Sequence, residues 1–142
     1  EAVLRSGVDL DPTGPHSGHA LFNLGKVLRS MQRHADAAPI FERAVQALER
    51  HGHLSAAVDA RVNAGNAHRS SNHLKMAAVA YMEALRSKHG GSSMYVAKYN
   101  LADVLFRSQR VDEARREYRD AVRMNAAPHA KGMFPHLVTL LG

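Results

Sequence analysis

Residues 63–84 read NAGNAHRSSNHLKMAAVAYMEA, and this stretch decides the fold because its pattern occurs three times in the chain. An Asn precedes a small residue by two positions, and then an Ala, an aromatic residue and a second Ala follow at helical spacing. The copies begin at Asn23, Asn63 and Asn100, so the period is 40 residues and then 37. Agreement in register over three copies predicts an internally repeated architecture. The other shared positions are Gly25, Ala37, Phe41 and Ala44, then Gly65, Ala77, Tyr81 and Ala84, then Ala102, Ala114, Tyr118 and Ala121.

Each copy contains two segments of helical length, separated by a short polar break at residues 32–34, 71–72 and 109–110. The small residue of the first segment allows a partner helix to approach closely, and the Ala–aromatic–Ala face of the second segment fits against it. One such pair cannot bury its apolar face alone, so neighbouring pairs must stack. The sequence therefore predicts an all-α protein. We expect helices at residues 2–10, 17–31, 35–50, 55–70, 73–88, 93–108, 111–124 and 129–141, N-caps at Ser17, Ser55, Asn72 and Ser92, and helix ends at Gly52 and Gly90.

The composition excludes several classes of protein. The chain has 142 residues, 45% of them hydrophobic, and a formal net charge of +6. A hydrophobic fraction of this size argues against disorder of the whole chain. Because the chain has no Cys, it holds no disulfide, no Cys zinc site and no cysteine nucleophile. No apolar run approaches the roughly 18 residues of a membrane span, and the ten His are not spaced as ligands, so we expect neither a metal nor another cofactor.

The repeated residues resemble the motif of the tetratricopeptide repeat family. In that motif an Asn-Leu-Gly-like first helix pairs with a second helix that carries Ala, an aromatic residue and Ala. The family's early aromatic residue is replaced here by Leu21, Arg61 and Lys98. The periods of 40 and 37 residues exceed the usual 34. This longer variant is similar to the repeats of kinesin light chains and of spindle-orientation adaptors.

The resemblance implies a right-handed superhelical array of antiparallel helix pairs, a solenoid with about three full repeats and a partial repeat at each end. The full repeats would occupy residues 17–52, 55–90 and 93–126. Residues 1–12 would be the end of a truncated upstream repeat, and residues 129–142 the start of a further helix. The chain is then expected to be a piece of a longer array.

In arrays of this family the first helices line a concave groove that holds partner segments, so the resemblance implies a protein-interaction scaffold or adaptor. Asn23, Asn63 and Asn100 would face this groove, where amides that both donate and accept suit the backbone of an extended partner. Arg side chains offer a planar fork for carboxylates. We therefore expect an acidic or amphipathic peptide or helix as the partner. The other expected groove residues are Phe22, Tyr99 and Phe106 for apolar contacts, and Lys26, Asn66, Arg29, Arg69 and Arg107 for polar ones.

Two other functions stay open at this point: an architectural segment that stacks within a large assembly, and an RNA-binding helical repeat. The hypothesis of RNA binding rests on a stripe of basic residues near the end of the third copy. Nucleic acid is the less favoured partner, because Asp112 and Asp120 each stand four residues from Arg116 and can pair with it. The stripe consists of Arg115, Arg116, Arg119 and Arg123.

No enzyme activity is expected within these residues. The sequence contains no phosphate-cradling Gly-rich loop, no nucleophile elbow and no repeated pair of acids, although a longer parent chain could carry a catalytic domain. No small-molecule ligand is expected. The cellular compartment stays open, with an intracellular one favoured. At the places that form a clamp for chaperone tails in one subfamily, this sequence agrees with the clamp in only one residue type. Those places hold Phe22, Lys26, Asn63, Val96 and Asn100.

Overall fold

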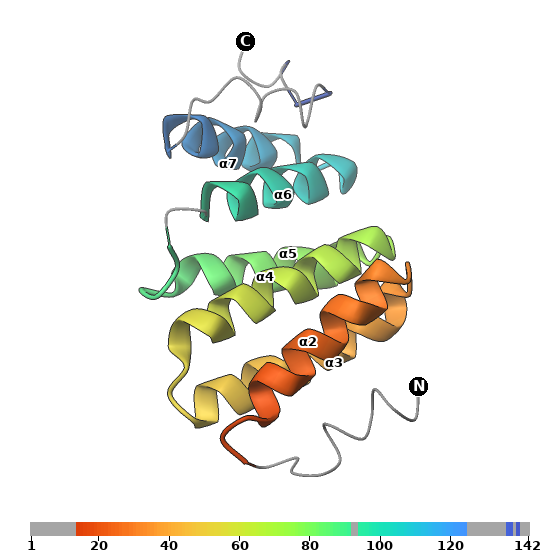
Figure 1. The fold of residues 1–142 in the computed structure, drawn as a ribbon. Helices are drawn as coiled ribbons and strands as arrows, with labels where there is room; N and C mark the ends of the chain where they lie inside the picture. The colour runs from red at the N-terminus through yellow and green to blue at the C-terminus, as the bar shows by residue number, and fades with distance from the viewer. Residues whose placement is uncertain (1–13, 92–93, 125–135, 138, 140–142) are drawn as a thin grey trace.

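The computed structural model describes residues 14–91, 94–124, 136–137 and 139. In this part of the chain there are six α-helices and no strand, which confirms the predicted all-α helical-repeat solenoid. Consecutive helices form hairpins, and the three hairpins stack in chain order (Figure 1). The second helix of one hairpin packs against the first helix of the next, α3 on α4 and α5 on α6. The helices are α2 (Ser17–Ser30), α3 (His34–Arg50), α4 (Leu54–Ser70), α5 (Leu74–Arg86), α6 (Met94–Arg107) and α7 (Val111–Met124).

The hairpins close where the sequence places its small residues. A Cβ added to Gly25 would lie 2.6 Å from Cε1 of Phe41, and one added to Gly65 would lie 2.8 Å from Cε1 of Tyr81. The aromatic rings of the second helices therefore lie directly on the backbone of the first helices. In the third hairpin Ala102 takes the glycine's place, and it is fully buried together with Tyr118.

Four turns end their helices in the same way. Gln32, Gly52, Asn72 and Gln109 all adopt left-handed backbone conformations, with φ between 61° and 77°. At the first turn the N–H of Gln32 donates to the carbonyl of Arg29 and the next N–H donates five residues back, and the same two bonds recur at the other three turns. These are Schellman motifs, in which the two bonds satisfy carbonyls that the helix end leaves open. The repeat of sequence is thus matched by a repeat of turn geometry.

The remaining connection, between α5 and α6, is different. Helix α5 ends at Arg86 and Ser87 is extended, so the predicted end at residue 88 is wrong and Gly90 does not end a helix. Helix α5 has 13 residues where α3 has 17, but the linker after α5 is longer, so α3 and α5 each begin 20 residues before the next first helix. The second period is shorter because Asn100 lies six residues after the start of α6, whereas Asn63 lies nine residues after the start of α4. Without an αL residue after Arg86, the chain leaves the helix directly into a linker.

The other predicted helix limits in the described residues, from 17–31 to 111–124, lie within one residue of those observed. The predicted side-chain caps are wrong: the N-cap positions before α2, α4 and α5 are His16, His53 and His73, and none makes a side-chain capping bond. Predicted helix 2–10 and the cap at Ser92 lie outside the described residues. Of predicted helix 129–141 the structure describes residues 136, 137 and 139, which are in 3₁₀ conformation. Among the described residues no helix is long and apolar enough to cross a membrane.

Candidate binding groove

The first helices of the three hairpins together line a hollow of ≈ 400 Å³. On α2 its residues recur at spacings of four and three, so they lie on one helix face, while Leu21, Gly25 and Leu28 are buried. Because α2, α4 and α6 all contribute, the hollow crosses the repeat boundaries. Its lining consists of Phe22, Lys26 and Arg29 from α2, Asp59, Val62 and Asn63 from α4, and Met94, Val96 and Ala97 from α6.

One wall of this hollow combines an aromatic ring with a cation. Phe22 is half-buried and stands edge-on to Phe41, with ring centroids 5.8 Å apart. Nζ of Lys26 lies 5.6 Å from the centroid of the Phe22 ring, within the range of a cation–π contact. The Phe22 ring therefore offers an apolar surface that has a positive charge fixed beside it.

A hydrogen-bonded chain of side chains connects α2 to α4 at the hollow. Nη1 of Arg29 donates to Oδ1 of Asn63, and Nδ2 of Asn63 donates to the carbonyl oxygen of Asp59 at 2.8 Å. A guanidinium group has five N–H donors, so Arg29 keeps donors for an acceptor on a ligand. The bond to Asn63 holds the guanidinium group at the edge of the hollow and thereby lowers the entropy cost of using it.

The three repeated Asn side chains lie in different surroundings. Asn23 is exposed, whereas Asn63 is half-buried and bonded as described above. Asn100 is only 4% exposed, and its Nδ2 donates to Oδ1 of Asn66 at 2.9 Å. The predicted row of three equivalent amides is therefore wrong, because Asn63 and Asn100 each bond to a side chain of the preceding first helix, Asn63 to Arg29 and Asn100 to Asn66.

Asn66 joins two hairpins through a single oxygen atom. Its Oδ1 accepts from Asn100 on α6 and from the hydroxyl of Tyr81 on α5. Burial raises the pKa of the Tyr81 phenol above its usual value, so it stays a neutral donor. Asn66 therefore acts within the fold, at a place where the sequence predicted a ligand contact.

Tyr81 and its counterpart Tyr118 are both buried, but within the part of the chain that the structure describes only the hydroxyl of Tyr81 is hydrogen-bonded. This difference predicts that removing the two hydroxyls has different effects on stability. Tyr81→Phe should lower the free energy of unfolding by about 1 kcal/mol, because a satisfied hydrogen bond is lost. Tyr118→Phe should be neutral or slightly stabilising, because the Tyr118 hydroxyl is buried without a hydrogen-bond partner among the described residues. Urea unfolding followed by circular dichroism measures both. Equal losses in the two variants would contradict the assigned bonds.

Two of the expected groove arginines are engaged by a buried acid. Asp103 is 7% exposed, and its carboxylate contacts Nη1 of Arg69 at 3.3 Å, Nη1 of Arg107 at 3.6 Å and Nε2 of His136 at 2.8 Å. Nη2 of Arg107 also donates to Oδ1 of Asn72, at 2.8 Å. A carboxylate at this depth needs such partners, since burial of an unpaired charge is costly. Asp103 is not among the residues expected to line the groove, but it is the centre of this network.

Two of the predicted apolar contacts also lie elsewhere. Tyr99 is 1% exposed and packs against Tyr118, with ring centroids 5.4 Å apart, so its assignment to the groove is wrong. Phe106 is half-buried and its ring lies 5.7 Å from that of His136, outside the hollow. Phe106, and not Arg107, stands 37 residues after Arg69, so Arg107 is one position out of register with the other two arginines.

The hollow has lining residues that the sequence prediction missed. The 40-residue period that relates Asn23 to Asn63 also relates Phe22 to Val62, so alignment of the copies could have found Val62. The following period relates Asp59 to Val96 in the same way. Met94 carries no comparable signal, because it lies at the start of α6, where the copies differ in length.

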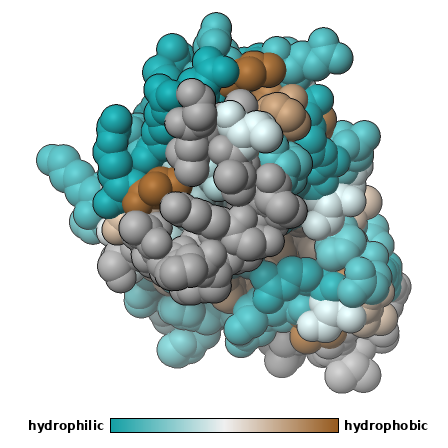
Figure 2. Space-filling view, turned by 90° about the horizontal axis from the view of Figure 1, so that it is seen from above, coloured by the Kyte–Doolittle hydropathy of each residue, from teal (hydrophilic) through white to brown (hydrophobic). Residues whose placement is uncertain are grey.

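Two of the four arginines in the basic stripe on α7 pair with acids of the same helix. Arg115 contacts Asp112 and Arg123 contacts Asp120, both at 3.1 Å and at i, i+3 spacing. The acids of α7 also reach Lys98 of α6, which lies 3.1 Å from Glu117. The acids expected to pair with Arg116 do pair within the helix, but with Arg115 and Arg123 instead. Viewed from the α7 end, most of the described residues that are visible are hydrophilic (Figure 2).

A family model described as tetratricopeptide repeat matches residues 1–51 and 62–129, which is more than half of the chain. The chain belongs to the tetratricopeptide repeat family. Tetratricopeptide repeats generally mediate protein–protein interactions and are typically not catalytic. A search of curated proteins returned no match. In this tetratricopeptide repeat chain, no group of three or more His, Asp or Glu among the described residues is placed to hold a metal ion.

Proposed function

We propose that the chain is a non-enzymatic interaction scaffold and that the hollow of α2, α4 and α6 binds a segment of a partner protein. The observation that carries this proposal is the composition of the hollow, with an apolar surface and preplaced polar groups in one concavity. Phe22, Val62 and Val96 supply the apolar part, and Lys26 and Arg29 supply donors held by contacts within the fold. Sites of this kind bind through apolar burial and obtain orientation from a few polar groups.

The charge of the hollow favours an acidic, amphipathic segment. Lys26 and Arg29 face a single carboxylate, that of Asp59, so the lining carries a net positive charge. A ligand carboxylate could accept from Arg29 while an apolar neighbour covers the Phe22 ring. Ordering a flexible segment costs free energy, so we expect a dissociation constant in the micromolar range or weaker.

Charge reversal at one lysine tests this site while leaving the fold intact. The probe is a fluorescein-labelled amphipathic peptide of Leu and Glu, with Leu on one helical face, titrated with the 142-residue chain and followed by fluorescence anisotropy. Lys26→Glu should weaken binding about tenfold or more, because a cation beside the apolar contact becomes an anion. Phe22→Ala should weaken it further, but it also removes packing against Phe41.

The matched control is Lys75→Glu on α5, which makes the same change in net charge away from the hollow. It should weaken binding about twofold at most, through the long-range field alone. Met31→Ala, at an exposed residue beyond the end of α2, serves as the apolar control and should have no effect. If Lys26→Glu and Lys75→Glu weaken binding equally, the hollow is not the site.

A further inference from the structure

A second groove lies on the other side of α4. It is lined by three residues of α4 that are about 180° around the helix from those of the first hollow, at 100° per residue. The outer helices α3 and α5 form its walls, and its volume is ≈ 520 Å³. We call it the outer groove. Its residues are Glu42, Val45, Gln46 and Glu49 of α3, Arg61, Ala64 and His68 of α4, and Lys75, Met76, Val79, Ala80 and Glu83 of α5.

The outer groove exposes apolar side chains that the fold leaves uncovered. Met76 is 51% exposed and Val79 is 46% exposed, and they stand one helical turn apart on α5. Val45 and Ala64 also line the groove, and they are buried. Exposed apolar groups gathered in a concavity lose contact with water when a partner covers them. The flexible thioether of Met76 adapts readily to a partner's shape.

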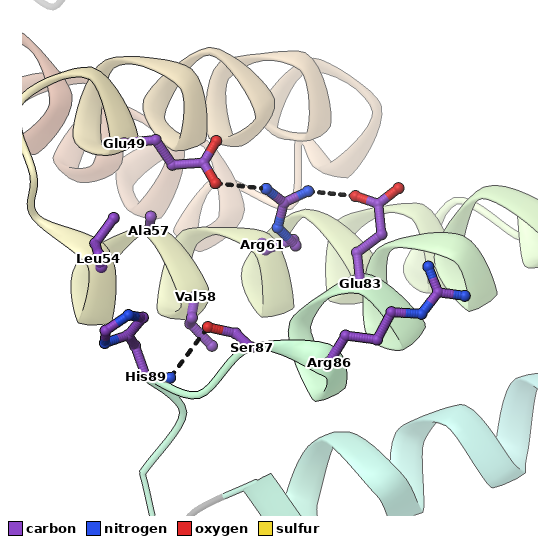
Figure 3. A pocket seen from close by; sticks show the side chains of 9 residues that line it. All are labelled: Glu49, Leu54, Ala57, Val58, Arg61, Glu83, Arg86, Ser87 and His89. Carbon is purple, nitrogen blue, oxygen red and sulfur yellow. Dashed lines mark hydrogen bonds and ion pairs between the residues drawn. The ribbon is translucent and has the colours of Figure 1, made fainter.

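Carboxylates border these apolar residues. Arg61 bridges the two walls, with Nη2 at 3.1 Å from Oε2 of Glu49 and Nη1 bonded to Oε2 of Glu83, so it uses one oxygen atom of each acid (Figure 3). The side chains of Glu49 and Glu83 stay about half exposed. Glu42 is similarly exposed, and Nε2 of His68 is 3.6 Å from it, beyond hydrogen-bond length.

The charge of this groove is opposite to that of the chain. Three carboxylates face Arg61 and Lys75, so the outer groove carries a net negative charge on a chain whose net charge is +6. A smaller hollow of ≈ 280 Å³ shares Glu49, Arg61 and Glu83 and continues the groove toward the exposed Leu54 (Figure 3). The complement of this surface is a segment with apolar residues flanked by cations.

We propose that the outer groove docks a cationic amphipathic helix of a partner protein. The walls run parallel to the helix axes: Glu42 to Glu49 covers about 10 Å and Lys75 to Glu83 about 12 Å, or roughly two turns of a docked helix. Apolar residues of the ligand at i and i+3 or i+4 would cover Met76 and Val79. Its Lys or Arg side chains would reach the open oxygens of Glu42, Glu49 and Glu83.

We call the first hollow, which α2, α4 and α6 line, the inner hollow. The proposal for the outer groove goes beyond the function proposed for the inner hollow and does not depend on it. The two surfaces have opposite charge and lie on opposite sides of α4, so they select different ligands. One chain would then hold two partner segments at once, which is the action of a scaffold.

The test uses an 18-residue fluorescein-labelled helical peptide of Leu and Lys, with Leu on one face, and the intact chain. We expect it to bind and expect the double variant Met76→Lys/Val79→Lys to bind about tenfold or more weakly, because central apolar contacts carry most of the energy of such interfaces. Glu42→Gln should reduce affinity by a smaller factor and flatten its salt dependence. Both changed α5 residues are exposed, so the variants should keep the melting temperature of the parent chain.

Matched controls separate this groove from general stickiness. Val111→Lys/Met124→Lys makes the same change at two exposed apolar residues of α7 and should leave the affinity unchanged. Lys26→Ala, in the inner hollow, should also leave it unchanged, because it removes a cation there without adding an acid. Unaltered binding by Met76→Lys/Val79→Lys would overturn the proposal. The proposal would also be overturned if the outer groove bound the Leu and Glu peptide as tightly as the Leu and Lys peptide.

Discussion

Gly65→Val should lower the free energy of unfolding by about 3 kcal/mol, because the new side chain has no room beside Tyr81. Even a Cβ would stand 2.8, 2.9 and 3.1 Å from three atoms of the ring. The ring is fully buried and its hydroxyl is bonded to Asn66, so it cannot move away without breaking that bond. The two further methyl groups of valine make the overlap larger than alanine would.

Thermal or urea unfolding measured by circular dichroism gives this loss directly. In a helix interior glycine is about 1 kcal/mol less favourable than alanine, and β-branched valine recovers only part of that difference, so the clash must first cancel this smaller gain. The control is Gly91→Ala, where nothing lies within 4 Å of an added Cβ and the effect should stay within about 0.5 kcal/mol. If the two variants were equally stable, the ring of Tyr81 would not pack on the glycine.

Asp103→Ala should lower the free energy of unfolding by about 2 kcal/mol. The substitution removes a nearly buried carboxylate that joins Arg69 of the second hairpin, Arg107 of the third and His136 beyond it. Breaking a buried ion pair from one side usually costs more than this, but the three partners of Asp103 are partly exposed and water can reach them. The network links neighbouring repeats, and stability of such arrays depends on these interfaces.

Urea unfolding of Asp103→Ala should accordingly show a lower midpoint and a broader transition, because the third hairpin loses one of its connections to the second. Asp112→Ala on α7 is the matched control. Its carboxylate pairs with Arg115 but is 89% exposed, so its loss should cost less than about 0.5 kcal/mol. Similar losses at both positions would show that the Asp103 contacts carry no special weight.

The fold was predictable because the decisive contacts repeat. A small residue on one helix and an Ala–aromatic–Ala face on the next recur in register, and Gly25 on Phe41 is the same contact as Gly65 on Tyr81. The irregular linker after Arg86 was not predictable, because Gly90 is a plausible helix end by composition but the helix ends four residues before it. Single exceptions to a repeat have no second copy to reveal them.

The candidate site was predictable only in part. Phe22, Lys26, Arg29 and Asn63 do line the inner hollow. The polar residues further along the array bond across repeat boundaries: Asn66 bonds to Asn100, and Arg69 contacts Asp103, in each case 34 residues later. Which side chains meet there depends on how closely successive first helices approach, and a one-dimensional pattern does not contain that distance. The outer groove has the same origin, since it forms between α3 and α5, helices of different hairpins.

The central claim is that the inner face of α2, α4 and α6 receives a partner segment. The most direct measurement is the mapping of backbone amide chemical shifts of the ¹⁵N-labelled chain during titration with the unlabelled Leu and Glu peptide. We predict shifts at Phe22, Val62 and Val96, on all three first helices, and none along α5 at Met76 and Val79. Shifts confined to α5 or α7, with the three first helices unchanged, would contradict the account.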